Sequence, residues 1–70
     1  MLTVAEILTL KQGEEIVVTW SGGNGPHTYK VVWLWPDDPE DVPCVDNIYN
    51  DPLIHSRSDV RCLHKVARAR

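Results

Sequence analysis

Two cysteines and two histidines are the residues of this chain best suited to bind a metal ion. In the order Cys44, His55, Cys62 and His64 they are separated by ten, six and one residues. Structural zinc sites use these ligand types but place two cysteines close together, in a knuckle of the spacing Cys-x2–4-Cys. The spacing found here lacks such a knuckle. A disulfide between the two cysteines would form in a secreted protein, but nothing in the sequence predicts secretion. We therefore expect two reduced, partly buried thiols, and keep a zinc-stabilised module as the weakest of three functional hypotheses.

A run of carboxylates follows the third tryptophan, at Asp37, Asp38, Glu40 and Asp41. Calcium loops need acidic ligands around a glycine at a sharp turn, and glycoside hydrolysis needs two carboxylates set in a cleft. The run contains no glycine, and a chain of 70 residues has little room for a cleft. We expect a solvated acidic loop that presents negative charge to a basic partner, which raises the association rate more than the affinity.

The glycine-rich segment SGGNG at 21–25 has the composition of a phosphate-binding loop. A P-loop ends in Gly-Lys-Ser/Thr and opens a helix, whereas here a proline and an apolar strand follow. Serine, cysteine and histidine occur without a nucleophile elbow or a Cys–His signature. The segment is therefore interpreted as a hairpin tip, and the sequence predicts neither catalysis nor a cofactor.

Three tryptophans and a tyrosine (Trp20, Tyr29, Trp33 and Trp35) lie on one candidate hairpin, in a chain without phenylalanine. Exposed aromatic residues can stack on bases or cage a methylated lysine, and tryptophan dominates the hot spots of protein interfaces. Because few other large side chains can fill the core, we expect Trp20 and Trp33 to belong to it. For Trp35, just before a proline, core and surface both remain open.

The charge is unevenly distributed along the chain. The net charge is −3, but residues 1–51 carry nine acids and two bases, whereas residues 52–70 carry five bases and one acid. The basic end could contact phosphates or fold back on the acids at 37–41. An acidic chain makes nucleic acid the less favoured partner. The bases of this end are Arg57, Arg61, Lys65, Arg68 and Arg70.

The hydrophobic period predicts the elements that must position these residues. Thr3 and Glu6 form a capping-box pattern, followed by apolar residues spaced three and four apart and then by Gly13. This pattern predicts a helix over 3–12. Beyond it the period becomes two, and we expect strands over 14–20, 27–35, 45–49 and 58–67.

Both faces of the predicted hairpin are partly apolar, so the ribbon must be curled or covered on its second side. We therefore expect one small domain over 1–70, of the α+β class and mainly β. Its architecture would be a short N-terminal helix followed by a strongly bent SH3-like barrel of four to five antiparallel strands. A fold of this size buries about 60% of its unfolded surface and has little stability to spare for a deep pocket.

The sequence thus favours a non-enzymatic protein-interaction module, an adaptor or an accessory or inhibitory protein, and a phage or mobile-element origin is compatible with that. With 43% hydrophobic residues, no apolar run long enough to span a membrane and no signal-peptide layout, we expect a soluble cytoplasmic protein. The alternative is single-stranded nucleic-acid binding by exposed tryptophans and the basic end. A homodimer is left open. The expected contacts with a basic protein surface are Trp35, Asp37, Asp38, Glu40 and Asp41.

Overall fold

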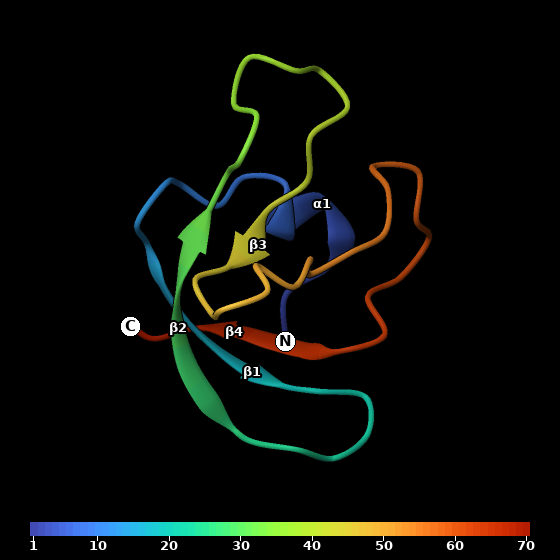
Figure 1. Cartoon of the computed structure of the whole chain (residues 1–70). Helices are drawn as coiled ribbons and strands as arrows, with labels where there is room; N and C mark the ends of the chain where they lie inside the picture. Colours follow the sequence, from blue (N-terminus) through green and yellow to red (C-terminus); the bar gives the residue numbers. More distant parts are fainter.

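The hairpin predicted from the alternating apolar residues forms the centre of the structure. The computed structural model describes all 70 residues, which form an antiparallel sheet with one short helix beside it (Figure 1). In chain order the elements are α1 (Val4–Ile7), β1 (Glu15–Thr19), β2 (His27–Val32), β3 (Cys44–Val45) and β4 (Lys65–Arg68). The four strands lie in the order β3-β2-β1-β4, so the hairpin occupies the middle of the sheet.

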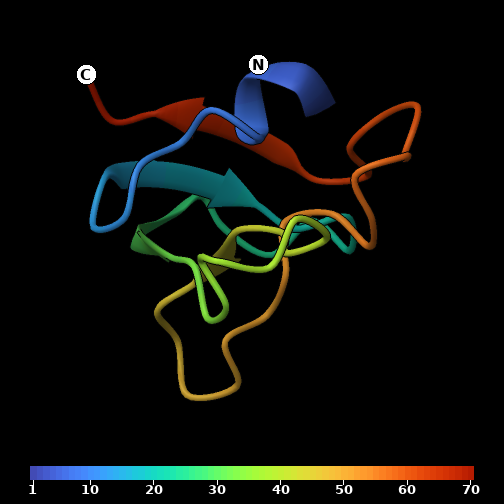
Figure 2. The same ribbon diagram turned by 90° about the horizontal axis from the view of Figure 1, so that it is seen from above.

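One face of the sheet carries the hydrophobic core. Ile16 and Val18, two residues apart on β1, are fully buried, as the period of two predicts. α1 packs against the same core and lies on the β4 side of the sheet (Figure 2). The buried residues of this core are Val4, Ile7, Leu10, Ile16, Val18, Val31, Val45, Leu53, Ile54 and Val66.

The capping box at the N-terminus is confirmed, but the helix is shorter than predicted. The Glu6 N–H donates to Thr3 Oγ1 at 3.2 Å, and the Thr3 N–H donates to Glu6 Oε1 at 2.9 Å. The prediction of a helix over 3–12 is wrong beyond Ile7. The Thr9 hydroxyl and the Thr9 N–H both donate to the Glu6 carbonyl, so the chain tightens into i→i−3 bonds and leaves the helix.

Side-chain hydrogen bonds end the second hairpin strand early, and the prediction of a strand over 27–35 is wrong after Val32. The Gln12 side chain accepts the Trp33 N–H and donates to the Trp33 carbonyl. Two residues further along the chain, the Asp41 carboxylate accepts the Trp35 N–H. These side chains occupy backbone groups that a neighbouring strand would otherwise pair with. The alternating residues after Val32 are therefore not part of the sheet.

The two later strands are also shorter than predicted. The strand expected over 45–49 is limited to β3, because the chain turns back after Val45. The strand expected over 58–67 is limited to β4. The Asp59 carboxylate accepts the N–H groups of His55 and Ser56 and holds residues 55–59 in a turn, and the side chains of Cys62 and His64 bond to other parts of the chain.

The sheet is open. β3 and β4 are its edges and do not pair with each other, so hydrogen bonds do not close the predicted barrel. Both edges are partly covered: the Leu2 N–H donates to the Val66 carbonyl of β4 at 2.7 Å, and Cys44 of β3 forms a bridge with Pro52. The mainly β architecture with one short helix is confirmed in this coarser form. α1 is the one helix, and its four residues are far too few to reach across a membrane.

Candidate functional site

The segment between β2 and β3, residues 34–41, projects beyond the end of the sheet (Figure 1). We name it the acidic loop, because it contains the four predicted carboxylates. At its start, Leu34 and Trp35 are exposed, and 68% of the Trp35 surface is accessible to solvent. The loop therefore presents an indole and an aliphatic side chain next to acidic groups.

The other two tryptophans pack against the core, as predicted. The Trp20 Nε1–H donates to the Tyr29 hydroxyl at 3.0 Å, and the Trp33 Nε1–H donates to the Leu10 carbonyl at 2.9 Å. The guanidinium carbon of Arg57 lies 5.7 Å from the centre of the Trp33 ring. Their polar edges are thus satisfied within the fold, and Trp35 alone of the three projects outward.

Two of the four carboxylates hold the acidic loop in shape. Asp41 Oδ2 accepts the Trp35 N–H at 2.9 Å, and Asp38 Oδ1 accepts the Glu40 N–H at 2.9 Å. Backbone bonds reinforce these contacts, from the Asp38 N–H to the Trp35 carbonyl at 2.9 Å and from the Asp41 N–H to the Asp38 carbonyl at 3.1 Å. The backbone of Trp35 is therefore fixed by two bonds from within the loop.

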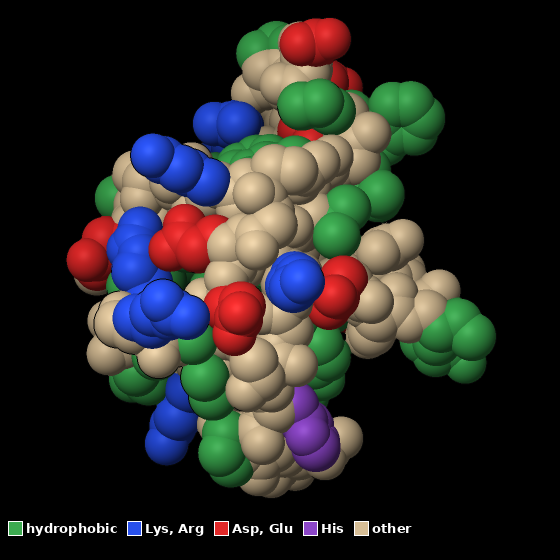
Figure 3. Space-filling model, turned by 90° about the vertical axis from the view of Figure 1, so that its left-hand side faces the viewer, with side chains coloured by type: hydrophobic (Ala, Val, Ile, Leu, Met, Phe, Trp, Pro, Cys, Tyr) green, Lys and Arg blue, Asp and Glu red, His purple; other side chains and the backbone are tan.

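The other two carboxylates, of Asp37 and Glu40, have no hydrogen bond or ion pair within the chain. The basic end does not neutralise them: Arg57 Nε donates to the backbone carbonyl of Asp41 at 2.8 Å, and Arg68 pairs with Glu14 instead. Of the four predicted acids, two carboxylates thus hold the loop in shape and two have no partner within the chain. The space-filling view shows acidic and hydrophobic side chains together at the tip of the molecule (Figure 3).

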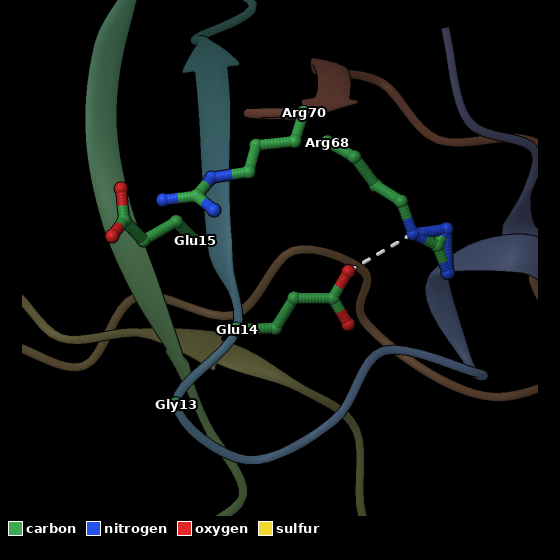
Figure 4. Close-up of a pocket in the computed structure, with 5 residues that line it drawn as sticks. All are labelled: Gly13, Glu14, Glu15, Arg68 and Arg70. Atoms are coloured by element: carbon green, nitrogen blue, oxygen red, sulfur yellow. Dashed lines mark hydrogen bonds and ion pairs between the residues drawn. The ribbon is translucent and has the colours of Figure 1, made fainter.

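A hollow of about 250 Å³ lies at the start of β1 and is lined by charged groups (Figure 4). Arg68 Nε lies 2.9 Å from Glu14 Oε2, and Arg68 Nη2 donates to Thr9 Oγ1 at 3.2 Å. Glu15 and Arg70 complete the lining together with Gly13. The hollow contains no nucleophile paired with a base, so we interpret it as a solvated ion-pair cluster that ties β4 to β1.

The four candidate zinc ligands are not brought together. No three histidine, cysteine or acidic side chains of the chain are arranged to hold a metal ion. Cys44 and Cys62 are free thiols, and the Cys62 thiol donates to the Leu53 carbonyl at 3.2 Å. Burial raises the pKa of both thiols, so little of either is the reactive thiolate at neutral pH.

His64 has a structural contact with the hairpin tip. Its Nδ1 accepts the Ser21 N–H at 3.1 Å, and its ring lies edge-on to the Trp20 indole with centroids 4.8 Å apart. The pKa of His64 is lowered from its usual 6.5, first by burial and then by the nearby His55, while Asp51 opposes this shift. The fold therefore favours the neutral imidazole.

This shift predicts that the protein loses stability in mild acid. Below about pH 6.5 the unfolded chain binds a proton at His64 that the folded chain resists, so the free energy of unfolding falls until the pH passes the lowered folded-state pKa. Urea unfolding between pH 7.5 and 5 should show a smaller decrease for His64→Gln, which can accept the same bond without titrating. Equal slopes for the wild type and His64→Gln would contradict this prediction.

The sequence patterns missed two exposed residues, Ile48 and Tyr49. Both fall in the segment predicted as a strand, but lie in a turn, with 89% and 79% of their surfaces exposed. The strand predicted over 45–49 placed both residues in the sheet and so concealed this turn. The signal that would have revealed it is the surrounding sequence DN–IY–NDP, because Asn, Asp and Pro are typical turn residues.

The candidate site is thus the acidic loop, with Trp35 outward, Asp38 and Asp41 as internal supports and Asp37 and Glu40 free. It is a convex, charged and partly apolar surface rather than a cavity. Only its geometry indicates what it could bind. The chain matches no protein-family model, no curated protein and no solved structure.

Proposed function

We propose that this chain is a non-enzymatic interaction module that docks on a basic surface of a larger protein through the acidic loop. One observation carries the proposal: an indole with 68% of its surface exposed stands on a loop whose backbone is already hydrogen-bonded. Binding by a fixed loop loses little conformational entropy, and tryptophan is the residue type most enriched among interface hot spots. The residue that anchors the complex is Trp35.

Each residue of the loop has a distinct role in this proposal. Trp35, with Leu34 beside it, enters an apolar depression of the partner. Asp37 and Glu40 face lysine or arginine side chains around that depression, because their carboxylates are free. Asp38 and Asp41 act as positioning residues, since their carboxylates bind backbone N–H groups of the loop.

The surroundings of Trp35 favour a protein partner over single-stranded nucleic acid. An indole that stacks on bases is normally accompanied by positive charge that attracts phosphates. Here its neighbours in the loop are carboxylates, and Arg68 of the basic end is occupied by Glu14.

Two free thiols suit the reducing conditions of the cytoplasm, which is the location we propose. SH3-like architecture, and a role as adaptor or inhibitor, remain part of the proposal.

Affinity capture from a lysate of the organism that encodes the chain tests the class of partner. Wild type and Trp35→Ala should be compared, each with and without nuclease. A protein retained by the wild type after nuclease treatment, and lost with Trp35→Ala, is the expected result. Retention that disappears with nuclease would instead support the nucleic-acid hypothesis and contradict the proposal.

Charge reversal at the free acids should slow association with the captured protein. Asp37→Lys and Glu40→Lys together are expected to lower the association rate constant about 10-fold or more at low ionic strength, because the loop then repels the basic surface. The difference should nearly vanish near 1 M salt, where the Debye length is about 3 Å. Stopped-flow or surface-plasmon measurements over a salt series give this rate.

The control for charge reversal is Glu15→Lys. It changes the net charge as much as Asp37→Lys or Glu40→Lys does alone, so it is compared with these two single variants. Unlike them, it lies at the start of β1, beside the charged hollow. Its association rate should follow that of the wild type much more closely. A similar decrease for Glu15→Lys would mean that net charge, rather than the acidic loop, governs association.

A further inference from the structure

The turn that follows β3 exposes two large apolar side chains that no part of the chain covers. Ile48 and Tyr49 occupy its apex, and 89% and 79% of their surfaces face solvent. We name residues 46–51 the Ile48–Tyr49 turn; it projects from the sheet as a narrow loop (Figure 2). Turn apices usually carry glycine, proline or small polar residues, so an isoleucine and a tyrosine at this place are unfavourable for the isolated chain.

Hydrogen bonds hold this turn in one conformation. Asn47 Oδ1 accepts the Asp51 N–H at 3.0 Å, and Asn47 Nδ2 donates to Asp51 Oδ2 at 2.7 Å. The Asn50 N–H donates to the Asn47 carbonyl, and Asn50 Nδ2 donates to the Val45 carbonyl, both at 3.1 Å. Asn50 has φ +48°, a left-handed conformation that asparagine tolerates better than most residues. Every polar side chain of this clamp is used to fix the backbone.

The base of the turn is joined to the sheet. The Lys30 N–H donates to Asp46 Oδ1 at 3.0 Å, and the Asp46 N–H donates to the Lys30 carbonyl at 3.1 Å. The turn is therefore an extension of the β2–β3 edge. The acidic loop precedes β3 and the Ile48–Tyr49 turn follows it, so residues 42–45, which include β3, separate the two protruding segments. Figure 3 shows hydrophobic side chains on two protrusions, one at the top and one at the right-hand side of the view.

The chain itself has no apolar pocket that could receive these side chains from a second copy. Its three larger hollows are lined by charged and polar residues and glycine, with Tyr29 as the one aromatic side chain among them. The hollow between Leu63 and Ile54 encloses about 20 Å³, which is space for roughly one water molecule. A partner must therefore supply the pocket. Asp46 and Asp51 outnumber Lys30 around the turn, so the charge there has the same sign as on the acidic loop.

We infer that the Ile48–Tyr49 turn inserts into an apolar pocket, bordered by basic residues, on the same protein that binds the acidic loop. This inference rests on the proposed function and adds a second anchor to it. Two rigid apolar protrusions with an acidic surround match the usual anatomy of a protein interface, an apolar centre with a polar rim. Ile48 and Tyr49 supply contact area, and the Asn47–Asp51 clamp keeps the cost of ordering them low.

Photo-crosslinking tests both anchors separately. The photoreactive residue p-benzoylphenylalanine is placed at position 35, 49 or 60 of the full chain, and each protein is irradiated in lysate of the source organism. Val60 is the control position, because it is almost fully exposed but lies away from both protruding segments in the sequence. The expected result is one and the same crosslinked protein from positions 35 and 49, and none from position 60.

The outcomes separate the inference from the proposed function. A product from position 35 alone overturns the second anchor and leaves the acidic loop as the binding site. A product from position 49 alone, or from neither, overturns both. A product of twice the chain mass at position 49 would identify a second copy as the occupant and overturn the inference. With the identified partner, Ile48→Ser with Tyr49→Ser should weaken binding at least 10-fold, mainly by faster dissociation, whereas Val60→Ser should not.

Discussion

Replacing Trp35 by alanine is expected to weaken partner binding by about 30- to 1,000-fold, which corresponds to about 2–4 kcal/mol. The reason is that an exposed indole on a pre-ordered loop gains most of its burial in the complex. Stability should change by less than about 0.5 kcal/mol, because the side chain is largely solvated and alanine keeps both backbone bonds of residue 35. Titration calorimetry and thermal unfolding of the same variant measure the two effects.

Trp33→Ala is the matched control for this prediction, because it removes the same side chain two residues earlier. Trp33 packs against the core and donates to the Leu10 carbonyl, so its loss should lower the free energy of unfolding by about 3 kcal/mol. Trp33→Phe keeps much of the packing and should fold well enough to bind normally. If Trp35→Ala bound with wild-type affinity, Trp35 would not be the anchor and the proposed function would fail.

Replacing Gly25 by alanine should destabilise the protein by about 3 kcal/mol and lower the melting temperature by at least about 10 °C. Gly25 has φ +119°, a conformation open almost only to glycine. A Cβ there would lie 2.7 Å from the Val18 carbonyl oxygen, 3.2 Å from the His27 nitrogen and 3.3 Å from the Thr19 Cα. All three are backbone atoms of the central hairpin, so none can move aside without disturbing the pairing of β1 with β2.

Gly22→Ala tests whether this effect depends on position. Gly22 lies in the same hairpin tip, has no positive φ, and a Cβ there would meet no atom within 4 Å. Its melting temperature should stay close to that of the wild type or rise slightly, since alanine restricts the unfolded chain. Similar losses in both variants would indicate that the tip needs flexibility in general, and that the close approach at Gly25 is not the cause.

Local patterns in the sequence predicted the centre of the fold. The alternation along β1 correctly identified Ile16 and Val18 as core, and Thr3 with Glu6 identified the helix start. These features depend on residues a few positions apart, whose period and capping chemistry can be read directly. The absence of phenylalanine likewise placed Trp20 and Trp33 against the core, since few other side chains can fill the space.

The sequence alone could not say where the strands end. Alternation continues past Val32, but Gln12, 21 residues earlier than Trp33, takes the hydrogen bonds that a neighbouring strand would need. It also could not place Ile48 and Tyr49 outside the sheet, because the clamp between Asn47 and Asp51 depends on how the chain turns after β3. In both cases a polar side chain competes with a neighbouring strand for the same backbone groups. Which of the two forms the hydrogen bonds depends on the folded arrangement.

By itself, then, the sequence determined the composition of the acidic loop, the aromatic hairpin and the mainly β character of the chain. Tertiary structure alone decided which acids are free. The sequence does not distinguish between the four carboxylates of the loop, at Asp37, Asp38, Glu40 and Asp41. In the structure, Asp38 and Asp41 bind backbone N–H groups and thereby fix Trp35 and its loop. The physical reason is that a carboxylate near an unpaired backbone N–H binds it, and the path of the loop determines which carboxylates come within reach.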